Sequence, residues 1–562
     1  MNDIVQTVFG LLGGLAVFIF GMNMMSECLQ KVAGDKMKKI LALLTKNPIL
    51  GVLAGTLTTA VLQSSSATTV MAIGFVSAGL MNLPQAISII MGANIGTTMT
   101  AQLLAFKISD YIYAIIFIGF IVSFITKSEK VKNIGNTIFA FGLLFLGIET
   151  MGDVMEPLAE SQIFIDMIAK VSDIPVLGVA VGTLMTLVVQ SSSATIAVLQ
   201  NFAEQAGPDG VTSIIGLTGA IPILLGDNIG TTITAVLASI GQSKNAKRTA
   251  VAHCLFNVSG CCLFIWFVEP YAKFIQWISP KGAEVEVISR QIANAHTTFN
   301  FVMVLIWLPL IWLMVKIVTK IIPDGKQDKA DLSTPKFLDD NLINQPSVAI
   351  QLVAKEIMNC GNIVRDMLHS TIKITNGANK KLLSEISEKA DIVRTLNVKI
   401  TDYIAELFSA GVLTEEQASH TTGAMYVLSD IDRIGALCKD VAVSLNDNAT
   451  ADKSYSSEAT ENLRSGLSLI EEMYSGAMDT IEYKDSAKVK DVLTKKDSVL
   501  ELDTDMRKRH MNRVAEGRCS ANLTAPFNDI LHTIDRMSNS CVNIAETVSK
   551  SVDFGYFISV NS

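Results

Sequence analysis

The chain has 562 residues, of which 49% are hydrophobic and 17% are charged, and its mean hydropathy is +0.40. This composition is too apolar for a soluble multidomain enzyme and too ordered for a disordered chain, so it indicates a membrane protein in contact with lipids. Residues 1–325 contain 18 basic and 18 acidic residues, whereas residues 326–562 contain 27 and 35 and hold the whole net charge of −8. We therefore expect a lipid-embedded part followed by a water-exposed part. Nucleic acid is not an expected partner, because neither part has a basic excess.

Seven long apolar runs in the first part predict full transmembrane spans. The first run has no basic segment or small-residue cleavage site before it, so we interpret it as a span and not as a signal peptide. The seven predicted spans are Val5–Met25, Pro84–Ala105, Tyr111–Ile125, Ile134–Met151, Val211–Ile240, Val251–Val268 and Phe299–Ile322.

Two further runs, Pro48–Leu80 and Pro175–Phe202, are apolar but rich in Gly, Ser and Thr, and polar residues interrupt each of them near its middle. Each run is long enough for two half-length helices. In lipid, an unpaired backbone must be buried in protein or line a cavity. We therefore expect both runs to form re-entrant hairpins.

The two runs are copies of one pattern. The string Gln-Ser-Ser-Ser-Ala-Thr at 63–68 recurs at 190–195, and Gly-Ala-Asn-Ile-Gly-Thr-Thr at 92–98 recurs at 226–232 with Asp in place of Ala. Two motifs that recur in the same order indicate a duplicated membrane fold. Lysine clusters that follow alternate spans mark the cytoplasmic loops, and they predict that the two copies are inverted.

The Gln-Ser-Ser-Ser strings combine hydroxyl groups with a carboxamide at the break of each hairpin. A half-helix that begins there would point free N–H groups and the positive end of its dipole into a cavity, which favours an anion. Hydroxyl oxygens and freed carbonyls can also coordinate a small cation. The alternative is close helix packing through Gly51, Gly55, Gly178 and Gly182. Packing alone, however, would tolerate Ala or Gly at most positions of the strings.

The Asn-Ile pairs that begin at Asn94 and Asn228 lie inside apolar segments, where flanking glycines would let the helix unwind. Side-chain oxygens there can complete the shell of a cation, and a glycine kink with a self-satisfied Asn is the alternative. Asp227 breaks the symmetry of the copies, because its counterpart is Ala93. An ionisable residue at membrane depth is a functional candidate, so Asp227 is either a sodium ligand or a capping residue near the interface.

A third repeated motif, Ala-His-x-x-Phe-Asn, occurs at 252–257 and again at 295–300. It places His, Phe and Asn on one helix face. A histidine pair could carry protons. We prefer hydrogen bonding between helices, which is common in membrane bundles.

The acidic tail is predicted to be helical throughout, because apolar residues recur at helical spacing. Ile431–Cys438 resembles Ile534–Cys541, which suggests two three-helix bundles. The six predicted helices are Val348–Ile374, Leu382–Phe408, Thr422–Leu445, Glu458–Ile481, Val489–His510 and Asn528–Val548.

The doubled strings and the Asn-Ile motifs closely resemble the signature of the type II sodium-dependent phosphate cotransporters, over about residues 1–322. The tail resembles a PhoU-like domain, as in bacterial members of that family that carry such a fusion. The resemblance implies sodium-coupled symport of inorganic phosphate by alternating access in the bacterial inner membrane, with a cytoplasmic regulatory domain. The implied substrate-binding residues are Gln63, Ser64, Ser65, Ser66, Gln190, Ser191, Ser192 and Ser193. The implied sodium ligands are Thr68, Thr195, Asn94, Thr97, Thr98, Asn228, Thr231, Thr232 and Asp227.

The expected architecture is an all-α polytopic membrane protein with a helical C-terminal domain. The transport domain covers 1–323, with repeat one at about 1–132, repeat two at about 133–270 and an extra span at about 296–322. A charged linker covers 324–345 and the PhoU-like domain covers 346–562.

Metal binding by the tail is left open. PhoU-like proteins often bind metal through acidic residues at i and i+4. Glu501 and Asp505 fit this spacing, but Glu388 and Asp391 in the first bundle are only three apart. Sodium is the expected cosubstrate and no organic cofactor is expected.

Two alternatives to phosphate symport remain, a sodium-coupled symporter of another small anion and a membrane phosphate sensor that does not transport. An enzyme is not expected, because no nucleophile–base pairing or nucleotide motif occurs in the chain. An assembly of identical chains is left open.

The only arginines before residue 326, Arg248 and Arg290, lie outside the repeated motifs, so bound cations are expected to balance a phosphate dianion.

Overall fold

In the computed structural model of the chain, the described residues are 3–42, 47–77, 79, 81–106, 108–159, 174–207, 209–323, 332–343, 346–411, 413–450, 455–483 and 486–551. Within these ranges the secondary structure is helical, apart from one isolated bridge between Ala206 and Ser213. The predicted all-α class is confirmed. The chain divides into two compact units, Met1–Gly325 and Lys326–Ser562.

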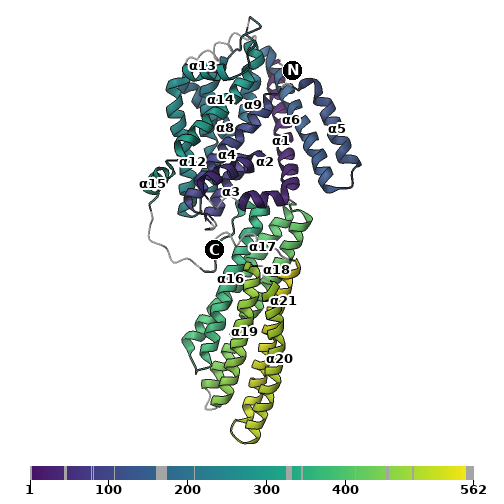
Figure 1. The fold of residues 1–562 in the computed structure, drawn as a ribbon, viewed down its shortest axis with the longest axis vertical. Helices are drawn as coiled ribbons and strands as arrows, with labels where there is room; N and C mark the ends of the chain where they lie inside the picture. Colours follow the sequence, from purple (N-terminus) through teal and green to yellow (C-terminus); the bar gives the residue numbers. More distant parts are fainter. Residues whose placement is uncertain are drawn as a thin grey trace. The chain divides into compact units, whose positions relative to one another are not determined.

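All the candidate membrane spans found among the described residues lie in the first unit, whose helices are labelled in Figure 1. Its described elements are α1 (Asp3–Ala42), α2 (Pro48–Leu62), α3 (Ser65–Ser77), α4 (Leu83–Leu104), η2 (Ser109–Tyr111), α5 (Ile112–Ile125), α6 (Glu129–Ala159), α8 (Pro175–Val189), α9 (Ser192–Ala203), α10 (Gly216–Gly230), α11 (Thr232–Ala238), α12 (Lys244–Phe264), η3 (Ile265–Phe267), α13 (Val268–Ile278), α14 (Glu284–Trp307) and α15 (Ile311–Ile321).

Five candidate spans occur among the described residues, and α14 with α15 makes a sixth if that bent pair is one span. The chain is therefore a membrane protein, but the count of seven full spans is not reproduced. Helix α5 has 14 residues, which extend about 21 Å at about 1.5 Å per residue, less than the roughly 30 Å of a bilayer core.

The predicted span Phe299–Ile322 does not form one straight helix. Helix α14 begins well before it, at Glu284, and α15 leaves α14 at an angle of 85°. Pro309 lies between the two helices. Leu308, the residue before it, still has helical backbone angles and donates to the carbonyl of Val304 at 2.8 Å. Proline has no N–H group with which to continue these hydrogen bonds, so the helix ends there and the chain changes direction.

Both Gly/Ser/Thr-rich runs fold as two half-length helices, as predicted. Helix α2 ends at Leu62 and α3 begins at Ser65, while α8 and α9 are separated at the equivalent place. Gln63 and Gln190 occupy the two breaks in the same left-handed conformation, with φ 53° and ψ 24°. They are the only non-glycine residues with positive φ in the described part of the chain. Such a residue costs roughly 1–3 kcal/mol, so the surrounding fold must impose it.

Glycines bring the repeated helices into backbone contact. An added Cβ at Gly55 would overlap the carbonyl oxygen of Ile89 on α4, and one at Gly182 would overlap that of Ile223 on α10. Helix α4 stays continuous through the glycines that flank Asn94, so the predicted unwinding is wrong there. In the second copy α10 ends at Gly230 and α11 follows after one residue.

In the residues that the structure describes, the second unit has six long α-helices. They run side by side (Figure 1). The prediction of six tail helices is confirmed. Helices α16–α18 and α19–α21 form two bundles, which α18 and α21, and α16 and α19, join into one apolar core. The helices are α16 (Pro346–Ile374), α17 (Lys380–Ser409), α18 (Glu415–Thr450), α19 (Ser457–Tyr483), α20 (Ser486–Ala515) and α21 (Thr524–Ser551).

Part of the predicted linker packs against this second unit. The backbone N–H of Phe337 donates to Glu356 Oε2 at 2.7 Å, and the Tyr403 hydroxyl donates to the carbonyl of Asp339 at 2.9 Å. Burial raises the pKa of Glu356, and its hydrogen bonds oppose that shift. Residues 332–343 are thus attached to α16 and α17. Residues 324–331 and 344–345 of the predicted linker lie outside the described residues.

Candidate functional site

The two Gln-Ser-Ser-Ser strings meet at one cavity of about 230 Å³ in the first unit. None of its lining residues is charged. All eight predicted substrate-binding residues line it, namely Gln63, Ser64, Ser65, Ser66, Gln190, Ser191, Ser192 and Ser193. The repeat therefore brings two distant segments to one polar, uncharged site.

Two helix N-termini converge on this cavity. Ser64 Oγ accepts from the N–H of Ala67 at 3.2 Å, and Ser191 Oγ accepts from the N–H of Ala194 at 3.3 Å. The first serine of each string therefore caps a helix. The hydroxyls of Ser65 and Ser192 have no hydrogen-bond partner among the described residues. These hydroxyls, the first-turn N–H groups and the positive ends of two helix dipoles suit an anion.

The two glutamines differ although their backbones match. Gln63 is 8% exposed, donates to the carbonyl of Ala60 at 2.5 Å and accepts from Thr100 Oγ1 at 3.0 Å. Gln190 is exposed, and its backbone N–H donates to the carbonyl of Thr186 at 2.8 Å. The first carboxamide is thus tied to α4, whereas the second is available to a ligand.

Asp227 lies at the centre of a buried oxygen cluster. It is 0% exposed, and its Oδ1 accepts from Thr186 Oγ1 at 2.7 Å while Oδ2 has no partner. Thr186 Oγ1 also lies 3.1 Å from Thr195 Oγ1. The reading of Asp227 as a capping residue near the interface is wrong, because it is buried inside α10. A buried carboxylate oxygen without a donor fits a bound cation.

The first copy has the same hydroxyl pair without the carboxylate. Thr59 Oγ1 donates to Thr68 Oγ1 at 2.8 Å, and Ala93 occupies the place of Asp227. The two copies therefore offer one charged and one neutral oxygen cluster.

The Asn-Ile motifs meet the Ala-His-x-x-Phe-Asn motifs. His253 Nε2 lies 3.3 Å from Asn94 Oδ1, and His296 Nε2 lies 3.4 Å from Asn228 Oδ1. Hydrogen bonding between helices, which we preferred for the third motif, is confirmed. Asn94 and Asn228 face α12 and α14 and not the threonine pairs.

The hydroxyls of four other predicted sodium ligands bond to backbone carbonyls nearby in the sequence. Each hydroxyl donates to a carbonyl three or four residues earlier, at 2.7 to 3.2 Å. These residues are Thr97, Thr98, Thr231 and Thr232. The acceptor of Thr231 is the backbone carbonyl of Asp227, but none of the four hydroxyls contacts the Asp227 carboxylate.

The sequence prediction missed the contribution of α1. This helix lines the cavity with Ile19, Met22, Asn23 and Ser26, and Ser26 Oγ donates to the carbonyl of Leu62 at 2.5 Å. Asn23 and Ser26 are polar residues three apart in an apolar span, which was the signal available. Thr186 was also missed, although its place in the repeated Gly-Thr-Leu-x-Thr stretch marked it.

No group of three or more metal-binding side chains occurs among the described residues. Asp505 Oδ2 is bonded to Arg509 at 2.7 Å, and Asp391 Oδ1 lies 3.3 Å from Lys439 Nζ. Two of the four acidic residues considered for metal therefore pair with basic side chains.

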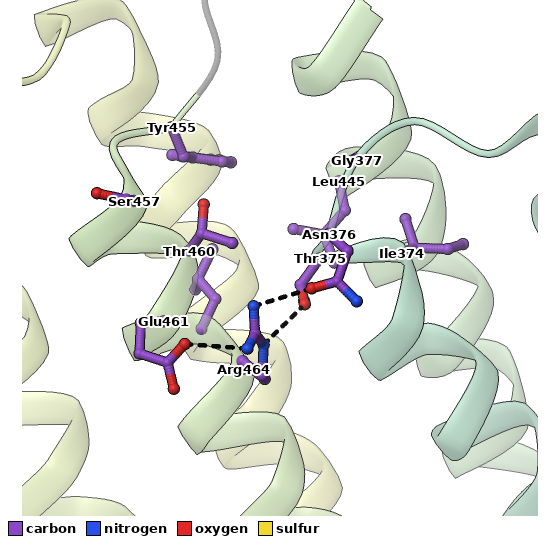
Figure 2. Close-up of a pocket in the computed structure, with 11 residues that line it drawn as sticks. Ile374, Thr375, Asn376, Gly377, Leu445, Tyr455, Ser457, Thr460, Glu461 and Arg464 are labelled. Carbon is purple, nitrogen blue, oxygen red and sulfur yellow. Dashed lines mark hydrogen bonds and ion pairs between the residues drawn. The ribbon is translucent and has the colours of Figure 1, made fainter.

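A second cavity, of about 420 Å³, lies where the two bundles of the second unit meet (Figure 2). Arg464 of α19 reaches across it. Its Nη2 donates to Asn376 Oδ1 at 2.9 Å, and its Nη1 lies 3.1 Å from Glu461 Oε2. With its charge paired and its donors in use, Arg464 holds the two bundles together.

Sequence comparisons agree with the two units. A Na+/Pi-cotransporter profile matches residues 17–153 and again 152–278, and a PhoU domain profile matches 357–445 and 463–548. This chain belongs to the Na+/Pi-cotransporter family. The resemblance drawn from the repeated motifs is confirmed. No solved structure matches the chain significantly.

Three relatives show how far the family match extends. The uncharacterized protein YqeW of Bacillus subtilis is 34% identical over 306 residues, 54% of this chain and 95% of that protein. The putative inorganic phosphate export protein YjbB of Escherichia coli is 26% identical over 410 residues, 73% of each chain. The rat sodium-dependent phosphate transport protein 2A is 40% identical over 99 residues, 17% of this chain and 15% of that protein.

Proposed function

We propose that this family member is a sodium-coupled symporter of inorganic phosphate and not an enzyme. The observation that carries the proposal is the uncharged cavity at which both Gln-Ser-Ser-Ser strings and two helix N-termini converge. Hydroxyl and N–H donors around one small volume suit a tetrahedral oxyanion.

The charge of phosphate must be balanced by something other than protein cations. Arg248 donates to the carbonyl of Ile322 and to Asn245, and Arg290 donates to Gln102, so neither lines the cavity. Bound sodium ions would supply the missing positive charge. Phosphate is then expected to bind poorly without sodium.

The proposed sodium ligands fall into two groups. Asp227 and Thr195 share Thr186, and Thr68 forms the equivalent neutral group with Thr59. Asn94 and Asn228 form the second group, beside the histidines. Thr97, Thr98, Thr231 and Thr232 are weaker proposals, because their hydroxyls contact backbone carbonyls alone, whereas those of Thr68 and Thr195 also contact a second threonine hydroxyl.

Alternating access between inverted repeats is the proposed mechanism, supported by the duplicated half-helix pairs and the lysine clusters. Ser128, between α5 and α6, and Val211, after α9, are both exposed and would then face opposite sides. Cysteines introduced at these positions should react with an impermeant thiol reagent from the cytoplasm and from outside, respectively. Reaction of both from one side would rule out the inversion.

The second unit is proposed to be a cytoplasmic regulatory domain of a protein in the bacterial inner membrane. The net charge of −8 in residues 326–562 and the PhoU domain matches support this. A chain truncated at about Asp324 should still transport phosphate. Correct insertion of the truncated chain without transport would show that the tail is required.

Uptake of radiolabelled phosphate into proteoliposomes, with and without an inward sodium gradient, tests the proposal. We expect sodium-dependent uptake that unlabelled phosphate inhibits more strongly than sulfate does. Equal inhibition by sulfate would favour a symporter of another anion. Binding without uptake would favour a sensor.

A further inference from the structure

Two buried helix faces carry side-chain atoms without hydrogen-bond partners. His253 and Asn257 lie one turn apart on α12, and His296 and Asn300 lie one turn apart on α14. All four side chains are at most 1% exposed. The Oδ1 atoms of both asparagines and the Nδ1 atoms of both histidines have no partner. A buried polar atom without a hydrogen-bond partner destabilises the fold. Unpaired atoms at equivalent positions of both copies of the motif therefore indicate a missing ligand.

Hydrogen-bond directions show what kind of ligand is missing. On α12, His253 Nε2 contacts Asn94 Oδ1, which can only accept, so Nε2 carries the proton and Nδ1 is left as an acceptor. Asn257 Nδ2 already donates to the carbonyl of His253 at 3.2 Å. The free atoms on this face are therefore acceptors. The same directions hold on α14 for His296, Asn228 and Asn300.

A small monovalent cation satisfies such a set of acceptors. Amide oxygens are hard ligands that suit sodium. Asp227, the carboxylate next to Asn228 in the sequence, is bonded to Thr186, so a divalent ion at these faces would lack compensating charge.

We propose that Asn257 and Asn300 are oxygen ligands of sodium ions, beside Asn94 and Asn228 respectively. His253 and His296 are positioning residues that hold the Asn94 and Asn228 carboxamides in place. This assignment rests on the proposed sodium coupling, and it extends the ion-binding surface from the repeated hairpins to α12 and α14.

Sodium-induced thermal stabilisation of the purified full chain, measured without phosphate, tests the assignment. Sodium chloride is titrated at constant ionic strength against choline chloride. We call the sodium concentration that gives half of the maximal thermal stabilisation the sodium midpoint. In Asn257→Leu and Asn300→Leu the sodium midpoint should rise about 10-fold or more, because an oxygen ligand is lost. Asn257→Asp keeps the oxygen and should retain the sodium response.

Ser259→Ala is the matched control. Ser259 on α12 accepts from Trp307 Nε1 on α14 at 3.0 Å, so this variant also removes a hydrogen bond between helices. Its sodium midpoint should equal that of the wild type. An equal rise in Ser259→Ala and Asn257→Leu would mean that general packing, and not ligation, sets the midpoint.

The positioning role predicts coupling between His253 and Asn94. His253→Leu should raise the sodium midpoint in the wild-type background, and His253→Gln should restore it because its amide can donate in the same place. In an Asn94→Ala background, His253→Leu should add nothing. Additive effects would overturn the positioning role.

The outcomes separate this assignment from the proposed function. A wild type that sodium does not stabilise would overturn both. A wild type with the expected response, together with wild-type midpoints in Asn257→Leu and Asn300→Leu, would overturn the assignment alone. If either leucine variant fails to fold, loss of the sodium response in His253→Leu and its recovery in His253→Gln decide the question.

Discussion

The two hairpins share a sequence pattern and a backbone, yet they are held in different ways. In the second copy Gln200 Nε2 donates to the carbonyls of Ala101 at 3.1 Å and Ser289 at 3.0 Å, which ties α9 to α4 and α14. The equivalent residue of α3 is Ile73, which packs against alanines of α11 and α12. The duplicated sequence thus gives both hairpins the same backbone, whereas substitutions outside the repeated strings give them different contacts with neighbouring helices.

The inequality extends to charge and exposure. Asp227 gives the second copy a buried carboxylate where the first has Ala93. Gln190 is exposed where Gln63 is buried and bonded to Thr100. We infer that the second copy holds the charged ion site, whereas phosphate needs the serines of both copies alike.

Removing the negative charge of Asp227 in the second copy should have the largest effect on transport. Asp227→Asn keeps the side-chain volume but loses the charge that would pair with a buried cation, an interaction worth about 3–5 kcal/mol. The sodium concentration for half-maximal phosphate uptake should therefore rise more than about 100-fold. Asp209→Asn, in the loop after α9, serves as the control. An unchanged sodium dependence in Asp227→Asn would mean that the copies do not differ in ion binding.

The second serines should matter equally in both copies. Ser65→Ala and Ser192→Ala each remove one hydroxyl that would bond a charged ligand, worth about 1.5–3 kcal/mol, or roughly 10- to 100-fold in phosphate affinity. Ser77→Ala, at the far end of α3, is the control. Phosphate uptake kinetics measure the effect. Wild-type phosphate affinity in both variants would indicate that the Gln-Ser-Ser-Ser strings serve helix packing and not phosphate binding.

The glutamines should separate stability from binding. Gln63→Ala removes the bond to Thr100 and should lower the free energy of unfolding by about 1–3 kcal/mol. Gln190→Ala should change it by less than about 0.5 kcal/mol, because the side chain is exposed. Thermal unfolding of both variants in detergent checks the difference. Equal destabilisation would show that the two breaks are supported alike.

The smallest effect on sodium dependence is expected when the threonines that bond only to nearby backbone carbonyls are replaced. Thr97→Val and Thr231→Val should change the sodium requirement by less than about twofold, because each hydroxyl contacts only a backbone carbonyl and no side-chain oxygen of a proposed ion site. Sodium titrations of phosphate uptake provide the measurement. A rise comparable to that of Asp227→Asn would restore these residues as ligands.

Local patterns were sufficient to predict much of the fold. The tail helix predicted as Val348–Ile374 is Pro346–Ile374, because an amphipathic helix of that length leaves a clear apolar period. The breaks at Gln63 and Gln190 were predictable because polar strings interrupt apolar runs. Pro309 was present in the predicted last span, but hydropathy alone does not report the change of direction that it causes.

Pairing between distant segments was not predictable from the same patterns. The repeats identify Thr186 and Asp227 as special positions, but only the crossing of α8 and α10 shows that their side chains meet. Glycines beside Asn94 suggested unwinding, whereas the structure uses them for backbone contact with α2. The different environments of Gln63 and Gln190 also cannot be read from identical strings.

Equilibrium binding of radiolabelled phosphate to the purified full chain in sodium chloride tests most directly whether both strings form one site. We predict one phosphate per chain, bound with the same loss of affinity in Ser65→Ala and in Ser192→Ala. Replacement of sodium by choline should abolish that binding. Two phosphates per chain, or full affinity in either serine variant, would contradict a single site shared by the two copies.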